Sequence, residues 1–244
     1  MRVFILSDLH IGFVNSQYDV MEQMINYISG EAGVGDQIWG LGDWFHMKET
    51  SLSECVKHPM TQKFRDLAGH TATRLIPGNH DEALAKYCDN RRLKNPLLPI
   101  EIIKPFWDKG FLYCHGHDFD PSFVTIGWLP AYWDKFAKKR QTPGELKGEN
   151  ITVPYLMRSY LVHSIALVEL PKRARREKQQ LCKGVVLGHT HLPVMQEAPH
   201  MPYLLNSGDM RGSGSFIILD NNGFHLMNWD DSSKKWLVTS SPQP

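Results

Sequence analysis

The chain has few cysteines, almost no net charge and no long uninterrupted apolar run, and each shortage excludes a class of protein. The four cysteines among 244 residues form no C-x-x-C pair. This argues against a disulfide framework or a zinc knuckle and favours reduced thiols in a cytoplasmic protein. The formal net charge of +1 provides no overall attraction to nucleic acid or to an anionic membrane.

The sequence predicts neither a membrane-spanning segment nor an export signal. The apolar start, Val3 to Ser7, is too short for the core of a signal peptide, so we expect no export signal. The longest apolar-rich stretch, residues 153–171, carries Arg158, His163 and Glu169, which makes it a poor transmembrane candidate. We therefore expect a cytoplasmic protein, with peripheral contact with the inner face of the membrane as an open alternative.

The pattern of apolar residues predicts one α/β domain that spans residues 1–244. Apolar runs at 2–7, 37–43 and 72–81 alternate with helical patterns at 18–30 and 59–68, as in parallel-sheet units. The C-terminal part reads as short antiparallel strands, with a tight turn at Asn222 and Gly223. Between them, residues 118–183 predict a helical cap inserted over the strand ends. Ligands of such sheets bind beyond the carboxyl ends of the strands.

Five apolar runs end in a polar cluster beside a glycine: SDLHIG, GLGDW, PGNHD, CHGHD and LGHTH. If the first strand continued past Ser7, Asp8 and His10 would share one face of it. A single cluster of this kind is explained more simply as a turn or a helix cap. Five at five predicted strand ends indicate a shared site. Their carboxylate, amide and imidazole donors suffice for two divalent ions, and the mixture favours manganese, iron or zinc over magnesium or calcium.

The ordered series D-x-H, G-D, G-N-H-D, H-G-H and G-H-T-H, which spans residues 8–191, resembles the calcineurin-like metallophosphoesterase superfamily. The resemblance implies a four-layer α/β/β/α sandwich, in which two mixed β-sheets are flanked by helices and a helical insertion lies over the active-site edge. It also implies a metal-dependent phosphohydrolase that cleaves a phosphoester or pyrophosphate bond with a metal-activated hydroxide.

The same resemblance implies roles for individual residues. Asp8, His10 and His191 would hold one metal ion, Asn79, His115 and His189 would hold a second, and Asp43 would bridge them. Mn²⁺ is the first expectation, with Fe²⁺ or Zn²⁺ as alternatives. His80 would be the general acid or the hydrogen-bond donor to the leaving oxygen, and a nearby carboxylate would favour its imidazolium form. Asp81 would orient the site or cap the turn, and His117 would lie near the substrate.

The predicted insertion carries the clue to the substrate. Aromatic residues within 123–133 adjoin the basic run KFAKKR, and KRARREK at 172–178 adds five basic residues in seven. Such a segment suits an anionic lipid surface or a nucleic-acid backbone. A helical cap with a small local core and solvated charges is an equal alternative.

The insertion resembles that of UDP-2,3-diacylglucosamine hydrolases, although the best-known branch of that group has arginine where this chain has His80. The first expectation for the substrate is therefore a nucleotide-lipid pyrophosphate. The alternatives are a phosphodiesterase or small nuclease acting on nucleic acid or nucleotides, and, in another class, a non-catalytic metal-binding scaffold. We expect a phosphorylated, amphiphilic substrate and no obligate protein partner.

Overall fold

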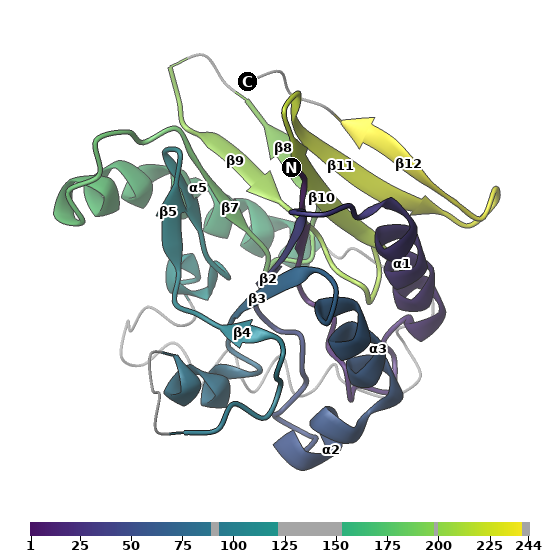
Figure 1. Cartoon of the computed structure of the whole chain (residues 1–244). Helices are drawn as coiled ribbons and strands as arrows, with labels where there is room; N and C mark the ends of the chain where they lie inside the picture. Colours follow the sequence, from purple (N-terminus) through teal and green to yellow (C-terminus); the bar gives the residue numbers. More distant parts are fainter. Residues whose placement is uncertain (89–92, 122–152, 198–199, 241–244) are drawn as a thin grey trace.

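Two mixed β-sheets form the centre of the protein. The computed structural model describes residues 1–88, 93–121, 153–197 and 200–240 (Figure 1). The first sheet has the strand order β12-β11-β10-β1-β2-β3-β4. Its strands are β1 (Val3–Leu6), β2 (Gln37–Leu41), β3 (Ala72–Ile76), β4 (Glu101–Ile102), β10 (Ser215–Asp220), β11 (Gly223–Asp230) and β12 (Lys235–Ser240). Strands β1 to β4 run parallel, and β10 joins β1 antiparallel.

The second sheet has the order β5-β6-β7-β9-β8. Its strands are β5 (Phe106–Asp108), β6 (Phe111–Tyr113), β7 (Gly184–Leu187), β8 (Val194–Gln196) and β9 (Tyr203–Asn206). Strands β6, β7 and β9 are parallel, and the two edge strands are antiparallel to their neighbours. The predicted pair of mixed sheets is confirmed, as is the antiparallel hairpin that turns at Asn222 and Gly223 between β10 and β11.

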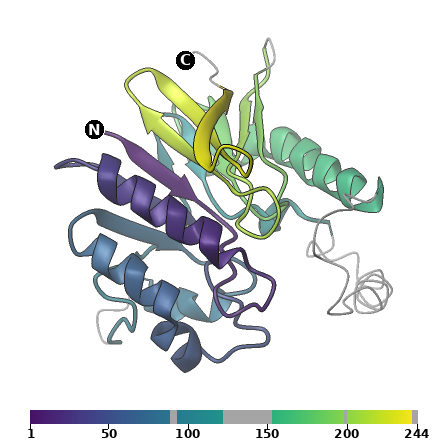
Figure 2. The same cartoon turned by 90° about the vertical axis from the view of Figure 1, so that its right-hand side faces the viewer.

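Helices cover the outer faces of the two sheets. Figure 2 shows α1 (Tyr18–Glu31) and α3 (Pro59–Ala68) on one side of the sandwich and α5 (Val153–Arg176) on the other. The short α2 (Leu52–Lys57) precedes α3, and two 3₁₀ helices, η1 (Glu82–Tyr87) and η2 (His117–Phe119), follow β3 and β6.

Strand β1 shows why the layers stack in this order. Phe4 and Leu6 pack in the core under α1 and α3, whereas Val3 and Ile5 pack in the core between the sheets. Alternate side chains of a strand point to opposite faces, so a four-residue run that is apolar throughout contributes to two cores. β1 is thereby buried on both faces, which fixes the position of the loop that follows it.

The predicted insertion is described only in part. Residues 122–152, which contain the aromatic run and the KFAKKR run, lie outside the described residues. Helix α5 packs Val162, Ala166 and Leu170 against β7 and β9, so this part of the segment forms an outer layer of the sandwich. In its last turn Arg173 pairs with Glu177 and Asp118, at 2.9 and 3.4 Å. None of the described helices combines the length and the apolarity needed to cross a bilayer.

The packing of α5 predicts unequal effects of two leucine substitutions in the same helix. Leu170 is fully buried against the second sheet, whereas Leu161 is 49% exposed. We expect Leu170→Ala to lower the free energy of unfolding by about 2–5 kcal/mol, since it leaves a cavity. Leu161→Ala should change it by less than about 1 kcal/mol. Urea denaturation of both variants checks this, and equal effects would show that α5 does not form the layer described.

Candidate metal centre

The predicted site residues lie in five loops at the carboxyl ends of parallel strands. The loops after β1, β2 and β3 are neighbours in the first sheet, and those after β6 and β7 are neighbours in the second. Backbone hydrogen bonds join them: the N–H of His10 donates to the carbonyl of Asp43 at 2.9 Å, and that of Gly188 donates to the carbonyl of His115 at 3.0 Å. The loops therefore form one connected surface.

Five of the seven predicted metal ligands have left-handed backbone conformations. The φ angles are 55° at Asp8, 50° at His10, 53° at Asp43, 66° at His189 and 56° at His191. Asp8 and His10 therefore do not share the face of an extended strand: the condition for that arrangement is not met, because β1 ends at Leu6. A non-glycine residue in this region costs about 1–3 kcal/mol, and such strain concentrates at functional sites.

The first cluster consists of Asp8, His10 and His191. The distance from Asp8 Oδ1 to His191 Nε2 is 3.2 Å, that from His10 Nε2 to His191 Nε2 is 3.3 Å, and that from Asp8 Oδ1 to His10 Nε2 is 3.8 Å. Ligands bonded to one ion at about 2.0–2.2 Å and separated by 90–109° lie about 2.8–3.6 Å apart. The two distances to His191 Nε2 match a single cation, and the distance between Asp8 and His10 lies just beyond this range. Asp8 Oδ1 is buried and, among the described residues, has no hydrogen-bond donor.

The second cluster consists of Asp43, Asn79 and His115. His115 Nε2 lies 3.3 Å from Asp43 Oδ2 and 3.1 Å from Asn79 Oδ1. The ring of His189 lies beside that of His115, with 5.1 Å between centroids. Ligand atoms of Asp8, Asp43 and His115 all lie within 4.8 Å of one another. The two clusters are therefore adjacent, and the donor set suits a pair of divalent ions.

Each of the four predicted histidine ligands has a polar partner on one ring nitrogen. His191 Nδ1 lies 2.8 Å from Asp209 Oδ2, and His189 Nε2 lies 2.8 Å from Asp120 Oδ2. His115 Nδ1 contacts the carbonyl of Leu41 at 2.7 Å, and His10 Nδ1 lies 3.2 Å from His46 Nδ1. Such partners fix ring orientation and tautomer in metal sites, leaving the opposite nitrogen for the ion. Arg158 of α5 holds Asp120 through a 2.9 Å bond from Nε.

Sequence reasoning missed Asp209, Asp120 and His46. His46 comes three residues after Asp43, and its ring nitrogen lies within 4.8 Å of those of His10 and His80, so it can also contribute to a cation site. Asp209 follows the end of β9, and Asp120 follows the H-G-H motif. The one signal in the sequence is that each of these polar residues comes shortly after a strand or a motif. Polar residues are common at such positions, so this signal could not identify the three.

The buried carboxylates raise the pKa values of two neighbouring histidines. Burial alone would lower the pKa of His115, but the Asp43 and Asp8 carboxylates raise it to about 9. Likewise, Asp8 and Asp209 outweigh burial and raise the pKa of His191 to about 10. Burial lowers the pKa of His189 to about 4. Because metal ligation requires neutral imidazole, ion binding would displace the protons of His115 and His191.

His80 lies at the edge of the first cluster. Its ring is edge-on to that of His10 at 4.8 Å, and its Nε2 lies 3.9 Å from Asp43 Oδ2 and 3.5 Å from Lys48 Nζ. Burial lowers the pKa of His80 to about 3, because the effect of burial is larger than the opposite effect of the Asp43 carboxylate. This pKa corresponds to a neutral ring near neutral pH, in contrast to the expected imidazolium.

Asp81 and His117, the other two predicted site residues, lie in different surroundings. Asp81 is fully buried and accepts backbone hydrogen bonds from Gly78 at 2.6 Å, Trp44 at 2.9 Å, and Asp43 and Phe45 at 3.3 Å. It thus ties the loop after β3 to the loop after β2. The ring of His117 lies 5.4 Å from that of His115, and its Nε2 lies 3.4 Å from Asp118.

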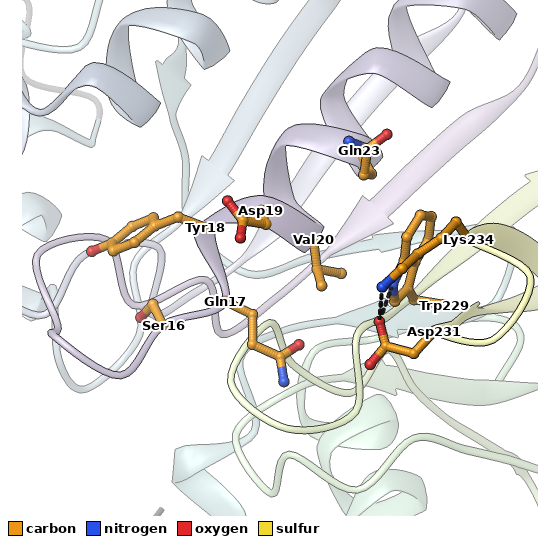
Figure 3. A pocket seen from close by; sticks show the side chains of 9 residues that line it. All are labelled: Ser16, Gln17, Tyr18, Asp19, Val20, Gln23, Trp229, Asp231 and Lys234. Carbon is orange, nitrogen blue, oxygen red and sulfur yellow. Dashed lines mark hydrogen bonds and ion pairs between the residues drawn. The ribbon is translucent and has the colours of Figure 1, made fainter. Parts of the chain in front are cut away.

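A cavity of about 640 Å³ lies elsewhere, between the start of α1 and the β11–β12 turn (Figure 3). No predicted site residue lines it. Its one lysine, Lys234, donates to Asp231 Oδ1 at 3.0 Å, and Trp229 Nε1 donates to the same atom at 2.9 Å. The cavity therefore lacks the converging metal ligands found at the strand ends.

Comparison with known proteins supplies the family. Residues 1–222 match the calcineurin-like phosphoesterase superfamily domain. The chain belongs to this superfamily. Among curated proteins it is similar to UDP-2,3-diacylglucosamine hydrolase of Shewanella sp. (strain ANA-3), with 22% identity over 93% of this chain and 97% of the relative. The protein of that name from Shewanella pealeana also has 22% identity, over 93% and 98%. Membership and these relatives identify a metal-dependent phosphohydrolase.

One solved structure supports the fold, and a second is reported as a similar chain. GAP50, described as the anchor in the inner membrane complex of Plasmodium, has a TM-score of 0.51 and 14% identity, over all of this chain and 88% of its own. Vacuolar protein sorting 29 from Cryptosporidium parvum has a TM-score of 0.49 and 15% identity, over 100% and 98%. At this identity the GAP50 likeness shows a shared fold and nothing about substrate.

A glycine substitution tests whether the clusters depend on close backbone approach. A Cβ at Gly188 would collide with Ser7 Oγ and Asp8 Oδ2, whereas one at Gly30, in α1, meets nothing within 4 Å. We expect Gly188→Ala to displace Asp8 and weaken manganese binding about 10- to 100-fold, as loss of ligand support does. Gly30→Ala should leave it unchanged. Calorimetric titration with Mn²⁺ measures both, and unaltered binding in Gly188→Ala would contradict the role of Asp8.

Proposed function

We propose that the two clusters hold two divalent ions for hydrolysis at phosphorus. Asp8, His10 and His191 bind one ion, Asn79, His115 and His189 bind the other, and Asp43 bridges both. The observation that carries the proposal is the convergence of ligand atoms at metal-like separations, 3.1–3.3 Å for four of the five measured pairs, within one buried surface. When bound, such ions polarise the phosphoryl oxygens and activate water for attack.

Mn²⁺ is the proposed ion, with Fe²⁺ and Zn²⁺ as alternatives. The donor set mixes imidazole nitrogen with carboxylate and amide oxygen, which magnesium and calcium sites seldom do. No cysteine belongs to the set: Cys114, next to His115, is buried, and burial raises the pKa of its thiol to about 12. The site therefore suits ions that bind nitrogen and oxygen donors better than ions that select thiolate.

His80 is proposed to donate a hydrogen bond to the leaving oxygen. The backbone N–H of His80 donates to Asp43 Oδ1 at 2.7 Å, so the residue is fixed to the proposed bridging ligand. Its Nδ1 is buried and has no hydrogen-bond partner among the described residues. A neutral imidazole keeps one N–H, which suffices for a hydrogen bond to developing negative charge. We propose that Asp81 holds this loop and that His117 lies on the substrate side.

Metal content and turnover together test this proposal. Metal-stripped protein with added Mn²⁺ should hydrolyse bis(p-nitrophenyl) phosphate or p-nitrophenyl phosphate. His80→Ala should lower kcat about 10²- to 10⁴-fold, as loss of a proton-donating group does, and should retain two bound ions by elemental analysis. His70→Ala, on an exposed turn, is the control. Absence of manganese-dependent turnover on any phosphoester would favour the scaffold alternative.

We propose a nucleotide-lipid pyrophosphate of the UDP-diacylglucosamine type as the substrate. The support is the similarity to UDP-2,3-diacylglucosamine hydrolases over 93% of the chain. Cleavage of its pyrophosphate needs no chemistry beyond that of the proposed centre. The aromatic and basic runs expected to receive acyl chains lie at 123–140, outside the described residues. Peripheral contact with an anionic membrane would accompany such a substrate.

Matched substrates test this choice. UDP-2,3-diacylglucosamine should be cleaved with a kcat/KM at least about 100-fold above that for UDP-glucosamine, because burying acyl chains contributes about 0.8 kcal/mol per CH₂ group. A single-stranded oligonucleotide and bis(p-nitrophenyl) phosphate complete the panel. Preference for the oligonucleotide would replace this proposal with the nuclease alternative.

A further inference from the structure

Arg211 lies on a loop that is fixed to the candidate metal centre. The residue two positions earlier is Asp209, whose carboxylate contacts His191. Between them, the N–H of Met210 donates to the carbonyl of Asp8 at 3.2 Å, and the carbonyl of Met210 accepts from Gln17 at 2.9 Å. On the other side, the N–H of Ser213 donates to Asp209 Oδ1 at 2.8 Å. The backbone of Arg211 is therefore held from both sides.

A series of ring contacts connects the Arg211 side chain to His80 of the candidate metal centre. Its guanidinium carbon lies 4.2 Å from the centroid of the Phe13 ring, a cation–π distance. The Phe13 ring lies 4.6 Å from that of His46, and the His46 ring lies 4.5 Å from that of His80. The guanidinium thus lies on the face of the site that holds the proposed leaving-group residue.

The Arg211 guanidinium makes no hydrogen bond or ion pair with any described residue. This contrasts with Arg158, across the centre, whose guanidinium is bound to Asp120. Burial lowers the pKa of Arg211, although Asp209 and Asp8 act in the opposite direction. Taking a guanidinium partly out of water without a carboxylate partner is costly. Its planar set of donors matches the oxygens of a phosphate in a bidentate manner.

We propose that Arg211 binds a second anionic group of the substrate, the phosphate next to the one that reacts, and so selects pyrophosphates over esters with a single phosphorus. The inference rests on the proposed function and specifies its substrate class. Phe13 packs against the guanidinium and has no side-chain oxygen or nitrogen that could accept its N–H groups. Lys48, 3.5 Å from His80 Nε2, supplies a second cation beside the reacting phosphate.

The test compares two substrates in each variant. The readout is the selectivity, which is kcat/KM for UDP-2,3-diacylglucosamine divided by kcat/KM for bis(p-nitrophenyl) phosphate. Arg211→Ala should lower this ratio about 30- to 100-fold, mainly by raising KM for the pyrophosphate, since a group remote from the reacting bond binds ground and transition states alike. Arg211→Lys keeps the positive charge but lacks the planar set of donors, and it should lower this ratio about 5- to 10-fold. Arg74→Ala, exposed on β3 and paired with Glu101, should not change it.

The outcomes separate this inference from the proposal on which it rests. If wild-type protein with Mn²⁺ hydrolyses neither substrate, the proposed function fails. If it hydrolyses both and Arg211→Ala leaves the ratio unchanged, or lowers both activities equally, Arg211 is structural and the inference is overturned. It is also overturned if wild-type protein cleaves the diester but neither UDP-2,3-diacylglucosamine nor UDP-glucosamine. Thermal unfolding of Arg211→Ala and Arg211→Lys verifies that both variants are folded.

Discussion

The burial of two neighbouring carboxylates is the constraint on which the rest of the site depends. Asp8 is fully buried and Asp43 is 1% exposed, and their ligand atoms lie within 4.8 Å of each other. Two charges of one sign at this distance, removed from water, are strongly unfavourable unless positive charge or hydrogen bonds compensate them. The raised pKa values of His115 and His191 place positive charge beside these carboxylates, and backbone N–H groups add hydrogen bonds. The N–H of His189 donates to Asp8 Oδ2 at 2.8 Å.

The two proposed divalent ions would compensate the same negative charge, and the fold holds the predicted ligands in place. Strands β1 and β2, which precede Asp8, His10 and Asp43, are short and place apolar side chains in the cores on both faces of the first sheet, so this packing fixes where the two loops start. That packing also sustains the left-handed backbone at Asp8, His10 and Asp43. Asp81, beneath the loops, binds four backbone N–H groups of two of them. The packing around these strands and loops therefore both fixes the positions of the predicted ligands and sustains their strained backbone.

Much of the fold and the predicted ligand clusters could be anticipated because the informative signals are local. Each ligand follows an apolar run, and the order of the motifs along the chain resembles that of a known superfamily. Helices α1 and α3 occupy the ranges that their apolar spacing predicts. The short strands β4, β5 and β8 carry too few residues for a periodic pattern to show.

The partners of the ligands could not be anticipated because tertiary structure brings them from elsewhere in the chain. Asp120 reaches His189 from 69 residues away, and His46 reaches His10 from 36 residues away. The low pKa of His80 also escaped prediction, since it depends on burial rather than on the adjacent Asp81. Local sequence therefore indicated which residues would meet, but not how each ring is oriented or charged.

The most direct test of the account is a crystal structure of the protein grown with Mn²⁺ and measured for anomalous scattering at the manganese edge. The account predicts two anomalous peaks about 3.5–4 Å apart. Asp43 should lie between them, with Asp8, His10 and His191 around one peak and Asn79, His115 and His189 around the other. A single peak, or an ion bound by His10, His46 and His80 in place of the pair, would contradict it.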